Sequence, residues 1–132
     1  MSDSTNPLHS LGRHLIVDLH GATHIDCEQT LHDAFDEIIE VTGATQLHRH
    51  FHRFTPNGVT GVACLAESHI SVHTWPDSGF AAFDIYMCGG SQPEWAIPIL
   101  QHHFNPQRIE KSLLERGRVD GEQRPPTTLI KQ

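Results

Sequence analysis

Between residues 47 and 87 the sequence alternates strand-length segments with turn signals, and this pattern limits the fold more than any other feature. The segments are residues 47–54, 59–66, 69–75 and 80–87. Two of the turns, Pro56-Asn57-Gly58 and Pro76-Asp77-Ser78-Gly79, carry strong signals, because proline presets a turn conformation and glycine permits a positive φ. Strands joined by tight turns pair antiparallel, so the middle of the chain predicts an antiparallel sheet.

The segments before and after this run predict two helices and two further strands. Apolar residues alternate over residues 14–20, which is typical of a strand with one buried face. Residues 28–42 carry a helical stripe, which Gly43 ends. Residues 91–103 predict a second, short or kinked helix with Pro98 inside it, and residues 108–114 predict a last strand. The stripes of the two helices are Leu31, Phe35, Ile38 and Val41, and then Trp95, Ile99 and His103.

Each predicted helix also begins with the pattern of a capping box, in which a short polar side chain and a residue three positions later cap each other's backbone. Asp26 and Gln29 form the first pair, and Ser91 and Glu94 the second. The sum of these elements predicts a single α+β domain over residues 1–132, with loose tails at 1–9 and 119–132. We expect a two-layer sandwich, with helices on one face of an antiparallel sheet and the other face packed at a dimer interface.

Composition excludes several classes of protein. The chain has 132 residues and a net charge of −7, so it has no electrostatic footprint for nucleic acid or an anionic membrane. Hydrophobic residues make up 37% of it, which builds only a thin core that a subunit interface would extend. No segment reads as a signal peptide or a membrane span. The 3 cysteines are widely spaced and indicate no disulfide framework, so we expect a reduced, cytoplasmic protein.

Three reactive side chains occur around the central hairpins. Ser68, beside Glu67, lies between two strand segments, His73 follows on the next strand, and Cys88 ends the strand after that. A hydroxyl, an imidazole and a thiol near one strand end would form a reactive centre. By spacing alone, however, such residues are more often a turn serine, a structural histidine and a small buried cysteine.

The run Glu67-Ser68-His69-Ile70-Ser71-Val72-His73-Thr74-Trp75-Pro76 resembles the processing-site signature of the prokaryotic S-adenosylmethionine decarboxylase family. The resemblance covers roughly residues 8–118. Its other parts are Leu11-Gly12-Arg13-His14-Leu15, Phe51-His52-Arg53-Phe54 with Pro56 and Gly58-Val59, Ala81-Ala82-Phe83-Asp84 with Cys88-Gly89, and Glu115-Arg116-Gly117-Arg118. A run of this length is too specific to arise by chance.

The resemblance implies a proenzyme that cleaves itself between Glu67 and Ser68. The products would be a β chain, residues 1–67, and an α chain, residues 68–132, on which Ser68 becomes a covalent pyruvoyl cofactor that binds substrate as a Schiff base. His73 matches the histidine needed for processing and Cys88 the proton donor. The implied reaction converts S-adenosylmethionine to CO₂ and decarboxylated S-adenosylmethionine for spermidine synthesis, in a homodimer of αβ protomers with no metal in the site.

Further positions match the family's processing and substrate-binding residues. Phe54 matches the aromatic residue that stacks on adenine, and Glu67 would line the site as the new end of the β chain. Two positions depart from the family pattern. Thr60 replaces a serine whose hydroxyl assists processing, and Asp77 replaces a glutamate that holds the ribose hydroxyls. A shortened ribose contact leaves open a related substrate, arginine or ornithine.

Two readings from other classes remain. His48, His50 and His52 alternate on one predicted strand and would share a face, and with 12 histidines in the chain a metal-binding protein is an alternative. The other reading is a relative that no longer cleaves itself and acts only as a binding or regulatory subunit. The presence of Ser68, His73 and Cys88 argues against it.

Overall fold

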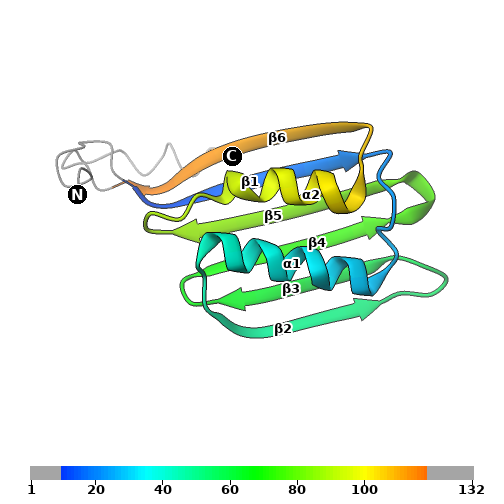
Figure 1. Cartoon of the computed structure of the whole chain (residues 1–132), viewed down its shortest axis with the longest axis horizontal. Coiled ribbons are helices and arrows are strands. Elements are labelled where there is room, and N and C mark those ends of the chain that lie inside the picture. Colours follow the sequence, from blue (N-terminus) through cyan, green and yellow to red (C-terminus); the bar gives the residue numbers. More distant parts are fainter. Residues whose placement is uncertain (1–9, 119–132) are drawn as a thin grey trace, which may run out of the picture.

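The computed structural model describes residues 10–118, and its elements form one six-stranded antiparallel sheet with both α-helices on the same face (Figure 1). The strands are β1 (Ser10–His20), β2 (Gln46–Arg53), β3 (Val59–Leu65), β4 (Ser68–Trp75), β5 (Phe80–Cys88) and β6 (Arg108–Arg118), and the helices are α1 (Glu28–Thr42) and α2 (Ala96–Phe104). Their order in the sheet is β2-β3-β4-β5-β1-β6. The expected α+β architecture with helices on one face is confirmed; the expected tails lie outside the described residues.

Helix α1 has the predicted ends, and its buried stripe forms the centre of the core. Leu31, Phe35 and Ile38 are fully buried against the sheet, and Gly43 ends the helix with a φ of 72°. The stripe differs from the prediction at its last turn, where Val41 is 46% exposed and Thr42 is buried instead. The helix turns 100° per residue. Two consecutive steps of three residues, from Phe35 to Ile38 and on to Val41, therefore rotate the predicted stripe away from the core.

Both predicted capping boxes are wrong, because tertiary contacts take their side chains. Cys27 is the first cap and makes no side-chain capping bond, while Asp26 accepts hydrogen bonds from the backbone of Gly58 and from Arg53. In the second pair, Ser91 donates to the carbonyl of Thr42, and Glu94 forms an ion pair with Arg13.

Helix α2 also buries a different stripe from the one predicted. It is preceded by the 3₁₀ turn η3 (Pro93–Trp95), and its buried side chains are Ala96, Leu100 and Phe104. Trp95 is 45% exposed. The 3₁₀ turn resets the helical phase, and Pro98 falls in the first turn of α2, where its missing N–H costs no helical hydrogen bond.

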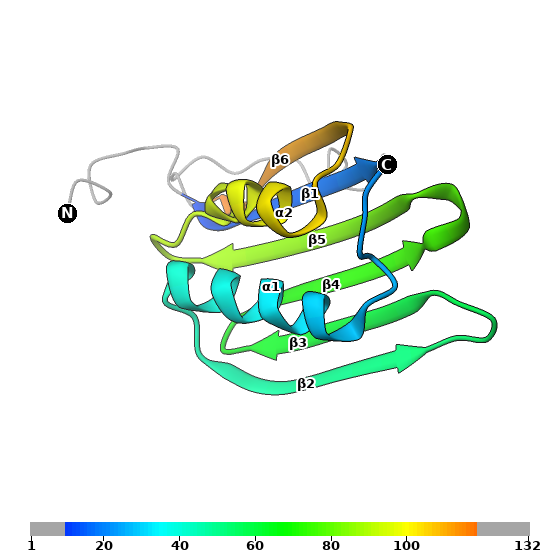
Figure 2. The same ribbon diagram turned by 45° about the vertical axis from the view of Figure 1, so that its right-hand side comes forward.

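The other face of the sheet has no helix over it within residues 10–118 (Figure 2). This open face carries the side chains that alternate with the buried ones on each strand. Histidines gather there: His14 and His20 on β1, His48, His50 and His52 on β2, and His69 and His73 on β4. The shared face predicted for the three β2 histidines is therefore confirmed. Neither described helix is long and apolar enough to cross a membrane.

Candidate active site

The turn between β3 and β4 holds Ser68 and Glu67 against the end of β5. The backbone N–H of Cys88 donates to Ser68 Oγ at 3.2 Å, and the Cys88 thiol donates to Glu67 Oε1 at 3.4 Å. A backbone bond from Gly89 to Leu11 fixes the residue after the cysteine as well. Three of the predicted residues, here called the Ser68 group, therefore meet within one chain: Glu67, Ser68 and Cys88.

Glu67 holds an unfavourable backbone conformation directly before Ser68. Its φ is 61°, in the left-handed region that costs a residue with a Cβ about 1–3 kcal/mol. Sequence inspection gives no sign of this, since glutamate is not a residue that favours positive φ. Ser68 thus directly follows a residue with a strained backbone conformation, and its hydroxyl lies beside the end of β5.

A row of rings lies one residue further along the strands from the Ser68 group, and the sequence analysis does not identify it. The Tyr86 ring stacks on His69 at 5.9 Å between centroids and meets His14 edge-on at 6.0 Å. The tyrosine also covers Gly12, which is the register partner of Cys88, so a side chain at Gly12 would collide with it. The three rings border the part of the open face that lies beside Cys88.

The pKa of His14 in this row is lowered. Burial lowers its pKa from 6.5, the carboxylate of Asp84 opposes this, and His69 and Arg116 add to the lowering. Its Nε2 is buried and has no hydrogen-bond partner among the described residues, and Asp84 is 3.8 Å away. A neutral imidazole avoids the cost of a desolvated charge there.

The opposite end of the same strands holds a second set of predicted residues. Thr60 and His73 are register partners on β3 and β4, and Thr60 Oγ1 lies 2.9 Å from His73 Nδ1. The hydroxyl that Thr60 retains in place of serine therefore contacts the histidine and orients its ring. His73 is exposed on the open face.

Phe54 and Asp77 lie on the two loops at this end. The Asn57 amide donates to Asp77 Oδ1 at 3.0 Å and joins the β2–β3 loop to the 3₁₀ turn η2 (Pro76–Ser78). The Phe54 side chain is 48% exposed. Asn57 is missed by the sequence analysis, which treats it only as part of a turn. These residues complete what is here called the His73 group: Phe54, Thr60, His73 and Asp77.

The two groups are at opposite ends of β4, so the expectation of one centre at a single strand end is wrong for a single chain. Ser68 pairs with Leu65 at the first position of β4, and His73 pairs with Thr60 near its last. Five residues of extended strand span about 17 Å. The extended geometry keeps His73 far beyond hydrogen-bond reach of Ser68 in its own chain.

Comparison with known proteins places the chain in a family. Residues 13–117 match the family model of S-adenosylmethionine decarboxylase. The S-adenosylmethionine decarboxylase proenzyme of Thermomicrobium roseum is 45% identical over 112 residues, covering 83% of this chain and 97% of that protein. The proenzyme of Aquifex aeolicus is 39% identical over 116 residues, covering 86% of each chain. The chain belongs to the S-adenosylmethionine decarboxylase family.

Solved structures agree with this assignment. The crystal structure of the adenosylmethionine decarboxylase from Aquifex aeolicus superposes with a TM-score of 0.77 at 36% identity, over 88% of this chain and 98% of that one. The Trypanosoma brucei AdoMetDC-delta26 monomer shares the fold, with a TM-score of 0.56 at 16% identity over 76% of this chain.

Proposed function

We propose that this protein is a proenzyme that cleaves itself between Glu67 and Ser68 and then decarboxylates S-adenosylmethionine, yielding CO₂ and decarboxylated S-adenosylmethionine for spermidine synthesis. Membership of the family and the names of the relatives support the activity, and they favour it over arginine or ornithine decarboxylation. The observation that carries the proposal is the left-handed backbone conformation of Glu67 directly before Ser68, whose hydroxyl accepts a hydrogen bond from Cys88. The chain would remain one domain, made of residues 1–67 and 68–132.

Cleavage starts at the serine hydroxyl. Ser68 Oγ attacks the carbonyl carbon of Glu67, and the acyl group moves from nitrogen to oxygen as the hydroxyl loses its proton to a base. The ester is then lost by elimination, which frees the carboxylate of Glu67 and leaves dehydroalanine at position 68. Hydrolysis releases ammonia and leaves the pyruvoyl group. Relief of the left-handed conformation at Glu67 favours the forward direction.

The pyruvoyl group, once formed, would supply a ketone for the substrate amine and a carbonyl that accepts electrons as CO₂ leaves. The residues around it would then supply and orient the proton that replaces CO₂. Cys88, whose backbone N–H donates to Ser68 Oγ at the end of β5, would deliver the proton from its thiol to the carbon that loses CO₂. That thiol donates a hydrogen bond to the Glu67 carboxylate, with Sγ and Oε1 3.4 Å apart, and this bond would orient it.

A second copy of the chain would complete the site. The base that matches the family, His73, is about 17 Å of strand away from Ser68 in one chain. If two open faces pack about a two-fold axis with their β4 strands antiparallel, the Ser68 group of one copy meets the His73 group of the other. Such a homodimer also covers the exposed apolar side chains of Ile16, Trp75 and Leu114.

The His73 group would also bind the substrate. Phe54 presents a half-exposed ring that can stack on adenine and face the sulfonium cation. Asp77 is one methylene shorter than the family's glutamate. It accepts a hydrogen bond from the Asn57 amide, which would hold the carboxylate for a contact with the ribose hydroxyls. All three described cysteines, Cys27, Cys64 and Cys88, are free, which fits a reducing cytoplasm.

The test is denaturing mass spectrometry of the purified chain, followed by release of labelled CO₂ from S-adenosylmethionine, arginine and ornithine. We expect two fragments split after Glu67, the second blocked at its amino terminus, and CO₂ from S-adenosylmethionine alone. Ser68→Ala should stay intact, whereas the matched control Ser71→Ala, on the same strand, should be cleaved. A wild-type chain that stays intact after long incubation, or CO₂ release by Ser68→Ala, would contradict the proposal.

A further inference from the structure

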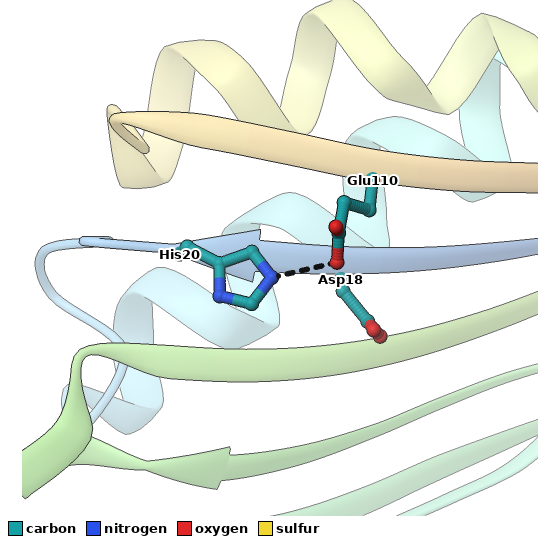
Figure 3. Close-up of side chains that lie close together, drawn as sticks. All are labelled: Asp18, His20 and Glu110. Atoms are coloured by element: carbon teal, nitrogen blue, oxygen red, sulfur yellow. Dashed lines mark hydrogen bonds and ion pairs between the residues drawn. The ribbon is translucent and has the colours of Figure 1, made fainter.

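Three metal-ligating side chains meet on the open face between β1 and β6, at the end of the sheet that also holds His73, with β5 between Asp18 and His73. Asp18 and Glu110 are direct register partners, and His20 lies two residues further along β1. One donor atom from each lies within 4.8 Å of the others, and His20 Nε2 is 3.0 Å from Glu110 Oε1 (Figure 3). All three project to the same side of the two strands (Figure 3).

The arrangement is close to what a metal requires, and it brings two carboxylates together beside an imidazole. A tetrahedral zinc ion with bonds of about 2.0–2.2 Å needs its donors about 3.4 Å apart. Two carboxylates directly opposite each other across antiparallel strands repel. Arg108 offsets part of this charge, but it binds Glu110 Oε2 at 2.8 Å and leaves Oε1 directed toward His20. The two strands are hydrogen-bonded along their length, so the donors stand on a rigid base.

We propose that Asp18, His20 and Glu110 form a binding site for a divalent transition-metal ion of the zinc, cobalt or nickel kind, with water in the remaining position. One imidazole nitrogen and two carboxylates suit these ions, whereas magnesium and calcium prefer oxygen donors alone. The site lies at the β1–β6 edge of the sheet and is complete within one chain. All three protein donors therefore come from one chain.

The experiment is titration of the tag-free protein with Zn²⁺ by calorimetry and with Co²⁺ by visible absorption, together with thermal unfolding with and without Zn²⁺. We expect one ion per chain, cobalt d–d bands, and a Tm that rises with Zn²⁺. Glu110→Gln and His20→Ala should each weaken binding by about tenfold or more and remove the Tm shift. Glu110 is exposed at the sheet edge, so its variant tests the site even if His20→Ala folds poorly.

The matched control is His50→Ala, at the centre of the exposed histidine row on β2 and on the same open face. This row is the competing chelator in the chain, since alternate histidines on a strand share a face. Retained binding in His50→Ala supports the β1–β6 site. Loss of binding in His50→Ala with full binding in Glu110→Gln and His20→Ala would overturn it, as would the absence of saturable Zn²⁺ binding in the wild-type protein.

Discussion

The two ends of β4 differ in how completely one chain builds them. At the Ser68 end, Glu67 has a strained backbone, and hydrogen bonds with Cys88 hold the Ser68 hydroxyl, the Glu67 carboxylate and the thiol together. At the other end, His73 is oriented by Thr60, but its ring and that of Phe54 face solvent. The first end is assembled by contacts within one chain. The second is a set of exposed groups that acquires a role only against another surface.

Complementation tests this difference most strongly. We expect His73→Ala alone to cleave roughly 100-fold more slowly, the usual contribution of a general base. Coexpressed with Ser68→Ala, the His73→Ala chain should regain cleavage, because a mixed dimer joins its intact Ser68 group to the intact His73 of the partner subunit. Mass spectrometry of differently tagged chains measures this. If the His73→Ala chain stays uncleaved in the mixture, the two groups do not combine between chains.

Removal of the thiol at the Ser68 end should separate cleavage from decarboxylation. Cys88→Ala is expected to yield both fragments but to release CO₂ roughly 100-fold more slowly, because the proton donor is lost while the attacking hydroxyl remains. The control is Cys64→Ala. Cys64 is an exposed thiol on β3, on the open face of the sheet, and its variant should keep full activity. Wild-type CO₂ release by Cys88→Ala would remove this residue from the mechanism.

Changes at Asp77 should affect binding at the His73 end and leave the Ser68 end intact. Asp77→Ala is expected to raise KM for S-adenosylmethionine roughly tenfold, with a smaller change in kcat, since a charge-assisted hydrogen bond contributes about 1.5–3 kcal/mol. Asp77→Glu, which restores the length of the family's side chain, should keep or lower KM. Steady-state assays over a range of substrate concentration decide this, and an unchanged KM in Asp77→Ala would exclude a ribose contact.

The smallest expected effect concerns the ring row beside Cys88. Burial lowers the pKa of His14 in the folded chain below its value of 6.5, so the unfolded chain binds more protons between these two values. The free energy of unfolding should therefore be highest above about pH 6.5 and fall as the pH drops toward the lowered pKa. Urea titrations of wild type and His14→Gln should show a flatter pH profile in the variant. An identical profile would indicate that His14 is not the group responsible.

Local patterns predicted the elements well because they depend on neighbours in the chain. The α1 boundaries, the β-strands and the turn residues follow from spacing, proline and glycine. The caps failed because Asp26, Ser91 and Glu94 have partners far away in sequence, and the local pattern does not include those competitors. The α2 stripe failed for a related reason, since a short 3₁₀ turn shifts the phase of everything after it.

The candidate residues themselves were identifiable from sequence only through a long resemblance, because Ser68, His73 and Cys88 are unremarkable by spacing. Their arrangement was not identifiable. The positive φ of Glu67 comes from closing a tight turn between β3 and β4, and the Tyr86 row arises from register among three strands. The meeting of Asp18, His20 and Glu110 likewise needs β6 to return beside β1.

The sequence by itself determined the alternation of strands and helices, the family and the identity of the reactive side chains, because these are written in periodicity and motif. Only the tertiary structure decided which of those side chains meet. An extended strand keeps residues five positions apart at opposite ends, whereas hydrogen-bonded strands bring residues twenty positions apart into contact, as Cys88 and Ser68 show. That geometry separates Ser68 from His73 within one chain.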